Sequence, residues 1–109
     1  MKKIMISQPM RGFSEEEIVE TRNRFLKYAE ENNLEVINTY FTDEWYSKEK
    51  MKDRGVEQIP LCFLSKSIEN MSMCNMAYFA TGWEKARGCK IEHDVAVAYG
   101  MEIIYEEMK

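Results

Sequence analysis

Short apolar runs alternate with amphipathic stretches along most of the chain. Four of these runs have the length of β-strands: residues 2–7, 34–38, 76–80 and 102–105. Three stretches repeat apolar residues at helical spacing: residues 14–32, 59–72 and 88–99. The pattern therefore predicts strands and helices in alternation.

Individual residues mark where the predicted helices begin and end. Ser14 and Glu17 have the Ser-x-x-Glu spacing of a capping box, which opens a helix. Asparagines at 32–33 tolerate the turn conformation that follows a helix. Pro60 suits a first helical turn, and Gly100 suits the left-handed residue after a helix end.

Residues 39–55 are the least regular part of the chain. They show no strand period and are dense in aromatic residues: Tyr40, Phe41, Trp45 and Tyr46. A short extra helix before residue 59 fits this stretch. The segment is either a functional flap or partner contact, or it packs over the edge of the sheet.

The order of the predicted elements is typical of an α/β protein with right-handed crossovers between parallel strands. We predict a single domain spanning residues 1–109, with a small doubly wound, flavodoxin- or Rossmann-like sheet. Its four parallel strands have the order 2-1-3-4, with helices on both faces. Ligands bind at the carboxyl ends of strands in such folds. Loops 8–13 and 81–88 leave two of these ends, and both contain glycine and arginine.

Glu92 lies about one turn into the helix predicted to begin near Gly88. A strand, a turn with glycines and a helix start together form a common anion site. A carboxylate in that first turn is stabilised by the positive end of the helix dipole, so we expect Glu92 to be ionised. Spacing alone favours a structural first-turn acid and leaves a functional role open.

Composition narrows the classes of function. Hydrophobic residues make up 45% of the 109 positions and charged residues 31%, which is typical of soluble globular domains. The net charge of −4 argues against a nonspecific nucleic-acid binder. No apolar run approaches the roughly 20 residues that span a bilayer, and no signal-peptide pattern opens the chain. We therefore expect a cytoplasmic protein with no membrane partner.

The cysteines do not indicate a metal site. Cys62, Cys74 and Cys89 lack the spacing of paired metal ligands, and the chain has a single histidine. A zinc site is therefore not expected, and neither is another cofactor.

Two segments resemble the motifs of one family. Residues 7–12 read Ser-Gln-Pro-Met-Arg-Gly, and residues 82–93 read Gly-Trp-Glu-Lys-Ala-Arg-Gly-Cys-Lys-Ile-Glu-His. They resemble the short, mostly phage and bacterial domain of unknown function in the nucleoside 2-deoxyribosyltransferase-like superfamily. The likeness runs nearly end to end in strand order, helix placement and length.

The resemblance implies a nucleoside or nucleotide pocket and N-glycosidic chemistry, either hydrolysis of the base–sugar bond or deoxyribosyl transfer. Superfamily enzymes use a glutamate one turn into this helix as the nucleophile, and Glu92 stands at that position. The resemblance gives binding roles to residues of both motifs: Ser7, Gln8, Pro9, Met10, Arg11, Gly12, Gly82, Trp83, Arg87, Gly88 and Cys89.

Asn75 stands where the family usually has an aspartate that exchanges protons with the leaving base. An amide cannot transfer a proton at neutral pH. The resemblance therefore leaves three possibilities open. The protein is an enzyme with Glu92 and Asn75 in its catalytic site, a non-catalytic nucleotide-binding protein, or a structural accessory domain.

Trp83 either stacks on a base or packs beneath the loop. His93 points away from Glu92, because adjacent helix positions are about 100° apart, and is expected to be a surface or supporting residue.

Superfamily members are similar in forming dimers or larger assemblies in which a neighbouring chain closes the pocket. We therefore expect a homodimer or larger homo-oligomer, with the aromatic segment 39–46 at the contact. The expected small-molecule partner is a nucleoside or nucleotide, not a nucleic-acid polymer.

Overall fold

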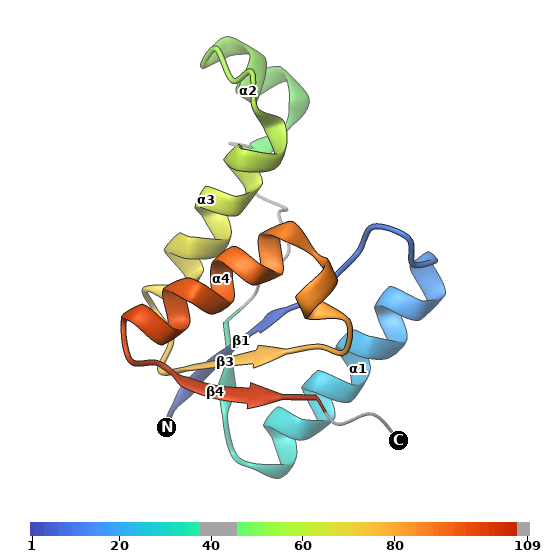
Figure 1. Ribbon diagram of the computed structural model, residues 1–109, viewed down its shortest axis with the longest axis vertical. Helices are drawn as coiled ribbons and strands as arrows, with labels where there is room; N and C mark the ends of the chain where they lie inside the picture. Colours follow the sequence, from blue (N-terminus) through green and yellow to red (C-terminus); the bar gives the residue numbers. More distant parts are fainter. Residues whose placement is uncertain (38–45, 107–109) are drawn as a thin grey trace.

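A computed structural model of the chain describes residues 1–37 and 46–106. Its strands are β1 (Lys3–Ser7), β2 (Glu35–Val36), β3 (Met76–Phe79) and β4 (Glu102–Tyr105). The helices in the described ranges are α1 (Glu15–Glu31), α2 (Lys48–Asp53), α3 (Ile59–Met71) and α4 (Arg87–Ala98), with the 3₁₀ helix η2 (Trp83–Lys85) before α4. Figure 1 shows their arrangement.

The strands form one parallel sheet in the order β2-β1-β3-β4. The central strand β1 pairs with β3 from Ile4 opposite Met76 to Ser7 opposite Phe79. Helix α1 covers one face of the sheet, and α3 and α4 cover the other (Figure 1). The predicted fold class and strand order are confirmed. Parallel pairing brings the carboxyl ends of β1 and β3 to the same edge, together with the loops that follow them.

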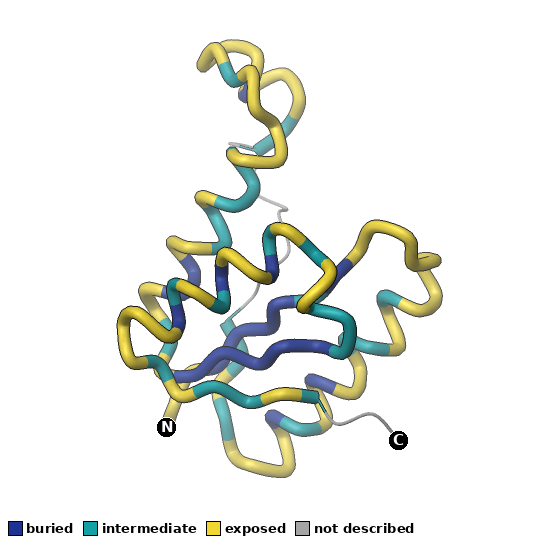
Figure 2. The backbone as a smooth tube through the Cα atoms, in the orientation of Figure 1, coloured by how far each residue is buried: buried dark blue, intermediate teal, exposed yellow. Residues whose placement is uncertain are grey.

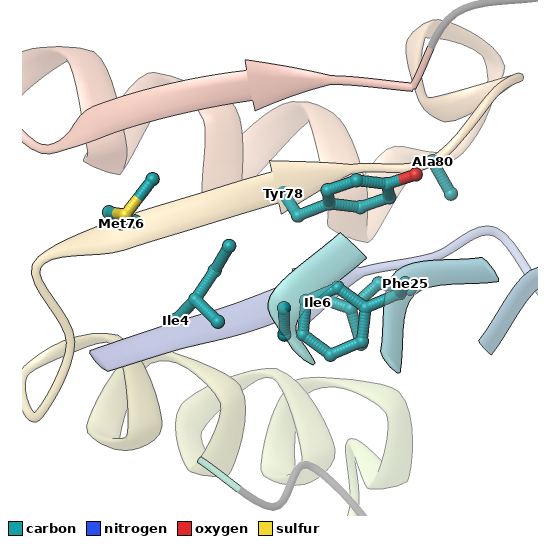
Figure 3. Close-up of a cluster of buried hydrophobic side chains, with 7 residues drawn as sticks. Ile4, Ile6, Phe25, Met76, Tyr78 and Ala80 are labelled. Atoms are coloured by element: carbon teal, nitrogen blue, oxygen red, sulfur yellow. The ribbon is translucent and has the colours of Figure 1, made fainter. Parts of the chain in front are cut away.

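Side chains of β1 and β3 point alternately to two hydrophobic cores. The core on the α1 side contains Ile4, Ile6, Phe25, Ala29, Met76, Tyr78 and Ala80 (Figure 3). The core on the other side contains Met5, Met71, Ala77, Phe79 and Ala96. Both strands are therefore buried on two faces (Figure 2). Burial on both faces explains why they read as continuous apolar runs rather than as alternating ones.

The predicted helix ends are present. The Ser14 side chain accepts a hydrogen bond from the Glu17 N–H at 3.1 Å, and the Glu17 carboxylate accepts one from the Ser14 N–H at 3.0 Å. These two bonds form the expected capping box. After α1 and α4, Asn33 and Gly100 have φ values of 54° and 69°, which is the left-handed conformation that ends helices.

Helix α2 and the first half of α3 project beyond the sheet (Figure 1). We call residues 46–64 the arm. Helix α2 falls within the stretch that shows no sequence period, because six residues are too few to display helical spacing. Its start is capped by the Ser47 side chain, which accepts a hydrogen bond from the Lys50 N–H at 3.2 Å.

Most of the aromatic segment 39–46 lies outside the described residues, which include only Tyr46 of that segment. Its predicted role at a subunit contact therefore stays a prediction. Within residues 1–37 and 46–106, no helix has both the length and the apolar character needed to cross a membrane.

Candidate functional site

A pocket of about 660 Å³ opens at the carboxyl ends of β1 and β3. Its walls are the loop after β1, the turn after β3 and the first turns of α4. The lining residues are Gln8, Pro9, Met10, Arg11, Phe13, Gly82, Lys85, Ala86, Arg87, Gly88, Cys89 and Glu92. Open α/β sheets bind ligands at this edge, and small-molecule sites are commonly about 300–1,000 Å³ in volume.

The two pocket loops meet at Gly82. This residue has φ of 91°, and a Cβ there would lie 3.6 Å from Pro9 Cγ and 3.8 Å from Phe13 Cζ. The left-handed conformation turns the chain out of β3 and into η2. Gln8 anchors the other loop, because its side-chain amide donates a hydrogen bond to the Ile18 carbonyl of α1 at 2.7 Å.

Helix α4 begins at the pocket without a side-chain cap. Its N-cap residue is Ala86, whose side chain has no polar atom, and the first backbone bond of the helix runs from the Lys90 N–H to the Ala86 carbonyl at 2.9 Å. The N–H groups of residues 87–89 precede that bond and have no partner within the helix. Uncapped N–H groups and the helix dipole together attract an anion.

Glu92 is buried on the pocket side of α4, with 7% of its surface exposed. Burial raises its pKa from 4.5 to about 7, and the nearby Ser7 hydroxyl offsets only part of this rise. The expectation of a fully ionised Glu92 is therefore wrong. Loss of hydration, which the sequence does not reveal, outweighs the favourable helix dipole.

Ser7 and Cys89 lie beside Glu92. The Ser7 hydroxyl is buried and makes no hydrogen bond of good geometry with the described residues, yet it is close enough to lower the pKa of both neighbours. Burial raises the pKa of the Cys89 thiol to about 11, so this thiol is protonated at neutral pH. An unpaired buried hydroxyl at the edge of a pocket is a group that a ligand can satisfy.

The rim of the pocket is basic. Arg11, Lys85 and Arg87 line it and are exposed. Among the described lining residues, Glu92 is the only acid. Glu84 is exposed and does not line the pocket, and Asp43 lies outside the described residues. In the same described ranges, no three His, Cys, Asp or Glu side chains cluster as a metal site requires.

Asn75 lies at the opposite end of the sheet. Its side-chain oxygen accepts a hydrogen bond from the Lys3 N–H at 2.8 Å, where β1 begins, and Asn75 does not line the pocket. The prediction of Asn75 as a catalytic partner of Glu92 is wrong, because a residue that enters a parallel strand lies at its amino end. Cys74 lies at the same end, where its thiol donates a hydrogen bond to the Asn70 carbonyl at 3.2 Å.

Trp83 and His93 pack in an aromatic cluster instead of lining the pocket. Their rings stack with centroids 4.2 Å apart, and the His93 Nε2 lies 2.6 Å from the Tyr105 hydroxyl. Of the two possibilities for Trp83, these contacts agree with packing beneath the loop and not with stacking on a base. Gly12 and Trp83 do not line the pocket, and the other predicted binding residues line it or, like Ser7, lie beside it.

A family model described as "Domain of unknown function (DUF4406)" matches residues 2–105. The chain belongs to this family. The match covers all four strands and the whole pocket of the DUF4406 domain. Comparisons with curated proteins and with solved structures gave no match.

Glu106 supports the pocket loop of this DUF4406 domain and was not predicted from the sequence. Its carboxylate accepts hydrogen bonds from the Arg24 Nε at 2.9 Å and from the Thr81 N–H at 3.0 Å. Burial acts to raise the pKa of Glu106, but the bonds from Arg24 and Thr81 outweigh it and hold the pKa below 4.5. No motif marks Glu106, because its partners come from α1 and from the turn after β3. Phe13, Lys85 and Ala86 also line the pocket without having been singled out, although the two predicted loops contain them.

Proposed function

We propose that this domain binds a nucleoside or nucleotide in the pocket and cleaves its base–sugar bond, with Glu92 as the nucleophile. The observation that carries the proposal is a buried carboxyl on the pocket wall, one turn from the uncapped start of α4. The likeness of residues 82–93 to the motif of nucleoside 2-deoxyribosyltransferase-like enzymes supports the same role.

The proposed reaction has two steps. An ionised Glu92 oxygen bonds to the anomeric carbon while the C–N bond breaks, and the base leaves with that electron pair and takes a proton from water. Water then opens the glycosyl ester, which releases the sugar and restores the carboxylate. A second base in place of water would give transfer. Because the pKa of Glu92 is about 7, the nucleophilic form and the rate should increase as pH rises through neutrality.

The pocket walls favour an anionic ligand. The first residues of α4, whose N–H groups are uncapped, line the same pocket as the basic residues Arg11 and Arg87. A phosphate would gain charge-assisted hydrogen bonds from both sources. A nucleotide is therefore a better match than an uncharged nucleoside.

A binding protein without chemistry is the second candidate, and one observation favours it. Glu92 is the only acid among the described lining residues, so no second carboxyl in that set can protonate the leaving base. Losing a positioned proton donor typically lowers the rate by about 10²–10⁴-fold. The same pocket would then hold a nucleotide as a signal or in storage.

A thermal-shift screen of nucleosides and nucleoside monophosphates, followed by chromatography of each hit for free base, tests the proposal. We expect Glu92→Gln to abolish base release while ligand affinity stays within a few-fold, because the amide keeps the shape but cannot form the ester. Glu84→Gln is the matched control, since Glu84 is exposed and outside the pocket lining.

The outcomes separate the candidates. Binding without base release by the parent protein would support the binding protein and contradict the enzyme. Base release that survives Glu92→Gln would contradict the nucleophile. Failure of every nucleoside and nucleotide to bind would reject both candidates.

A further inference from the structure

Three buried groups of different chemistry meet at the pocket wall. Cys89 and Glu92 lie in the first turns of α4, and both line the pocket. Ser7 ends β1 beside them, with 1% of its surface exposed and a hydroxyl that has no hydrogen bond of good geometry with the described residues. Cys89 is almost as deeply buried, with 5% of its surface exposed. The proposed function uses Glu92 and leaves the thiol and the hydroxyl without a role.

Helix geometry sets the distance between the thiol and the carboxyl. Cys89 and Glu92 are three residues apart on α4, so they share one face of the helix with Cβ atoms about 5–6 Å apart. In enzymes that cleave glycosidic bonds with retention, the nucleophile and the proton donor are about 5–5.5 Å apart and flank the bond that breaks. The pair on α4 therefore has the spacing of a nucleophile and an acid, with a thiol as the acid.

The Cys89 thiol holds a proton at neutral pH and becomes more acidic as the reaction proceeds. Burial raises its pKa to about 11, while the Ser7 hydroxyl lowers the pKa and the charge of Glu92 raises it. The contribution of Glu92 disappears when its carboxylate bonds to the sugar and loses its charge. The thiol is therefore most acidic while the base departs, which is when a proton is needed.

The surroundings stabilise the thiolate that such a proton transfer leaves behind. Cys89 is the third residue of α4, where the uncapped N–H groups and the helix dipole favour a negative charge. The Ser7 hydroxyl has one proton to donate, and it can turn from the carboxylate of Glu92 to the thiolate. A single negative charge moves between the two side chains, so the buried site never holds two.

The other proton carriers of the pocket are less suited to this role. Among the described lining residues they are Arg11, Lys85 and Arg87, and all three are exposed on the rim. Arginine does not release its proton in proteins. Lys85 is the one amine of this set, and its exposure keeps it in water instead of on the buried wall beside Glu92.

We propose that Cys89 is the general acid and base of the reaction in which Glu92 is the nucleophile, an inference that rests on the proposed function. In the first step the Cys89 Sγ–H gives its proton to the nitrogen of the leaving base, which keeps the electron pair of the broken C–N bond. In the second step the thiolate takes a proton from water, and the water oxygen bonds to the anomeric carbon. The ester C–O bond breaks, its electron pair returns to Glu92, and the thiol and the carboxylate are both restored.

Two kinds of leaving group separate acid catalysis from binding and folding. Nucleoside monophosphates of the common bases need a proton on the departing nitrogen, whereas para-nitrophenyl riboside and deoxyriboside phosphates release nitrophenolate without one. Cys89→Ala should lower the release of free base by about 10²–10⁴-fold. Its first turnover of the nitrophenyl probes should stay within a few-fold of the parent protein. Cys89→Ser should behave in the same way, because a hydroxyl fills the place of the thiol but is a much weaker acid.

The second step gives an independent readout. Without a thiolate to deprotonate water, Cys89→Ala should release nitrophenolate in a stoichiometric burst and then turn over slowly. Intact-protein mass spectrometry should find the sugar phosphate attached to the variant. Azide attacks the ester without losing a proton, so added azide should restore the turnover of the variant.

Cys74→Ala is the matched control, because Cys74 lies at the amino end of the sheet and does not line the pocket. It should match the parent protein with both kinds of probe, whereas Glu92→Gln should lose activity toward both. Base release by Cys89→Ala within a few-fold of the parent would overturn the proposal. An equal loss with both kinds of probe would also overturn it, because that result indicates a packing role for the thiol.

Two further outcomes would contradict the assignment of the proton to Cys89. A loss confined to nucleotide substrates in Lys85→Met, and not in Cys89→Ala, would move the proton donor to the rim. A parent protein that releases neither base nor nitrophenolate would contradict the proposed function and the role of Cys89 together. Base release that depends on Glu92 and not on Cys89 would leave the proposed function intact and overturn this inference alone.

Discussion

Glu92 combines two properties that conflict in a protein without ligand: it is buried, and it must ionise to act as a nucleophile. Its pKa is about 7 in the folded chain and 4.5 when unperturbed. Between these values the folded state retains a proton that the unfolded state releases. The free energy of unfolding therefore decreases as pH rises through this window, by about 3 kcal/mol in total.

Replacing Glu92 with glutamine should stabilise the ligand-free protein above pH 7, because the amide has no charge to desolvate. We expect a gain of up to about 3 kcal/mol at about pH 8 that disappears toward pH 4. Urea unfolding at a series of pH values measures it. Glu84→Gln should stay within about 0.5 kcal/mol of the parent protein at every pH. A structural first-turn acid would give the opposite result, a loss of about 0.3–1 kcal/mol.

Ser7 should tune the ionisation of its buried neighbour. The Ser7 hydroxyl lowers the pKa of Glu92, so Ser7→Ala should raise that pKa above its present value of about 7. Stability in acid, where Glu92 is protonated, should change little, since the hydroxyl has no hydrogen bond of good geometry with the described residues to lose. Above pH 7 the free energy of unfolding should decrease, because the raised pKa makes ionisation of Glu92 more costly. Carboxyl carbon shifts followed by NMR against pH report the pKa directly. Ser65→Ala, on the exposed face of α3, should leave it unchanged.

At the scale of elements, Glu106 joins α1 to the turn after β3, through Arg24 on one side and Thr81 on the other. Because its pKa is held below 4.5, its contribution to stability is present above pH 4.5 and is lost as pH falls through the folded value. The position of Thr81, where the turn after β3 begins, therefore depends on a carboxylate that follows β4.

Glu106→Gln should lower the free energy of unfolding by about 1–2 kcal/mol near neutral pH, because the neutral amide oxygen accepts weaker hydrogen bonds than the carboxylate that it replaces. The difference should shrink in acid. Glu102→Gln is the control, since its ion pair with Lys2 is exposed on both sides and is worth less than about 1 kcal/mol. Equal effects of the two changes in denaturant unfolding would contradict a special role for Glu106.

Elements with local signals were predictable, and those that depend on distant contacts were not. The capping box at Ser14 and the glycine after α4 follow from neighbouring residues alone, and both are present. The short extra helix expected before residue 59 is present as α2, but its bounds could not be predicted, because six residues are too few to show a helical period. The misplacement of Asn75 has another cause. Its role came from family likeness, whereas the direction of the strands puts the residue at the far end of the sheet.

The sequence predicted where the candidate site lies, but it did not predict the protonation state of Glu92. Both loops could be located because parallel strands place their carboxyl ends together. The protonation of Glu92 depends on how completely the fold removes water, which is a property of packing. Glu106 was missed for a similar reason, because its partners are remote in sequence.

At the scale of the molecule, the sheet with its two cores and the arm are packed separately. Met51, Tyr46 and Phe63 pack within the arm, and none of them belongs to either core of the sheet. Regions with few buried contacts to the rest of a fold open independently and at lower free energy.

Met51→Ala should therefore accelerate amide hydrogen exchange in the arm while leaving the amides of β1 and β3 protected. Phe25→Ala is the comparison, because Phe25 is fully buried against the sheet and its loss should cost about 3–5 kcal/mol throughout the domain. Mass-resolved exchange of peptides from the two regions measures both effects. Uniform acceleration by Met51→Ala would mean that arm and sheet unfold as one unit.

The three cysteines give each part of the molecule its own chemical probe. Cys62 lies in the arm, Cys74 at the amino end of the sheet and Cys89 on the pocket wall, and none is in a disulfide. Alkylation followed by peptide mapping can therefore record three local environments in one unmodified sample. Occupation of the pocket would slow labelling at Cys89, local opening of the arm would accelerate it at Cys62, and Cys74 would serve as the internal reference.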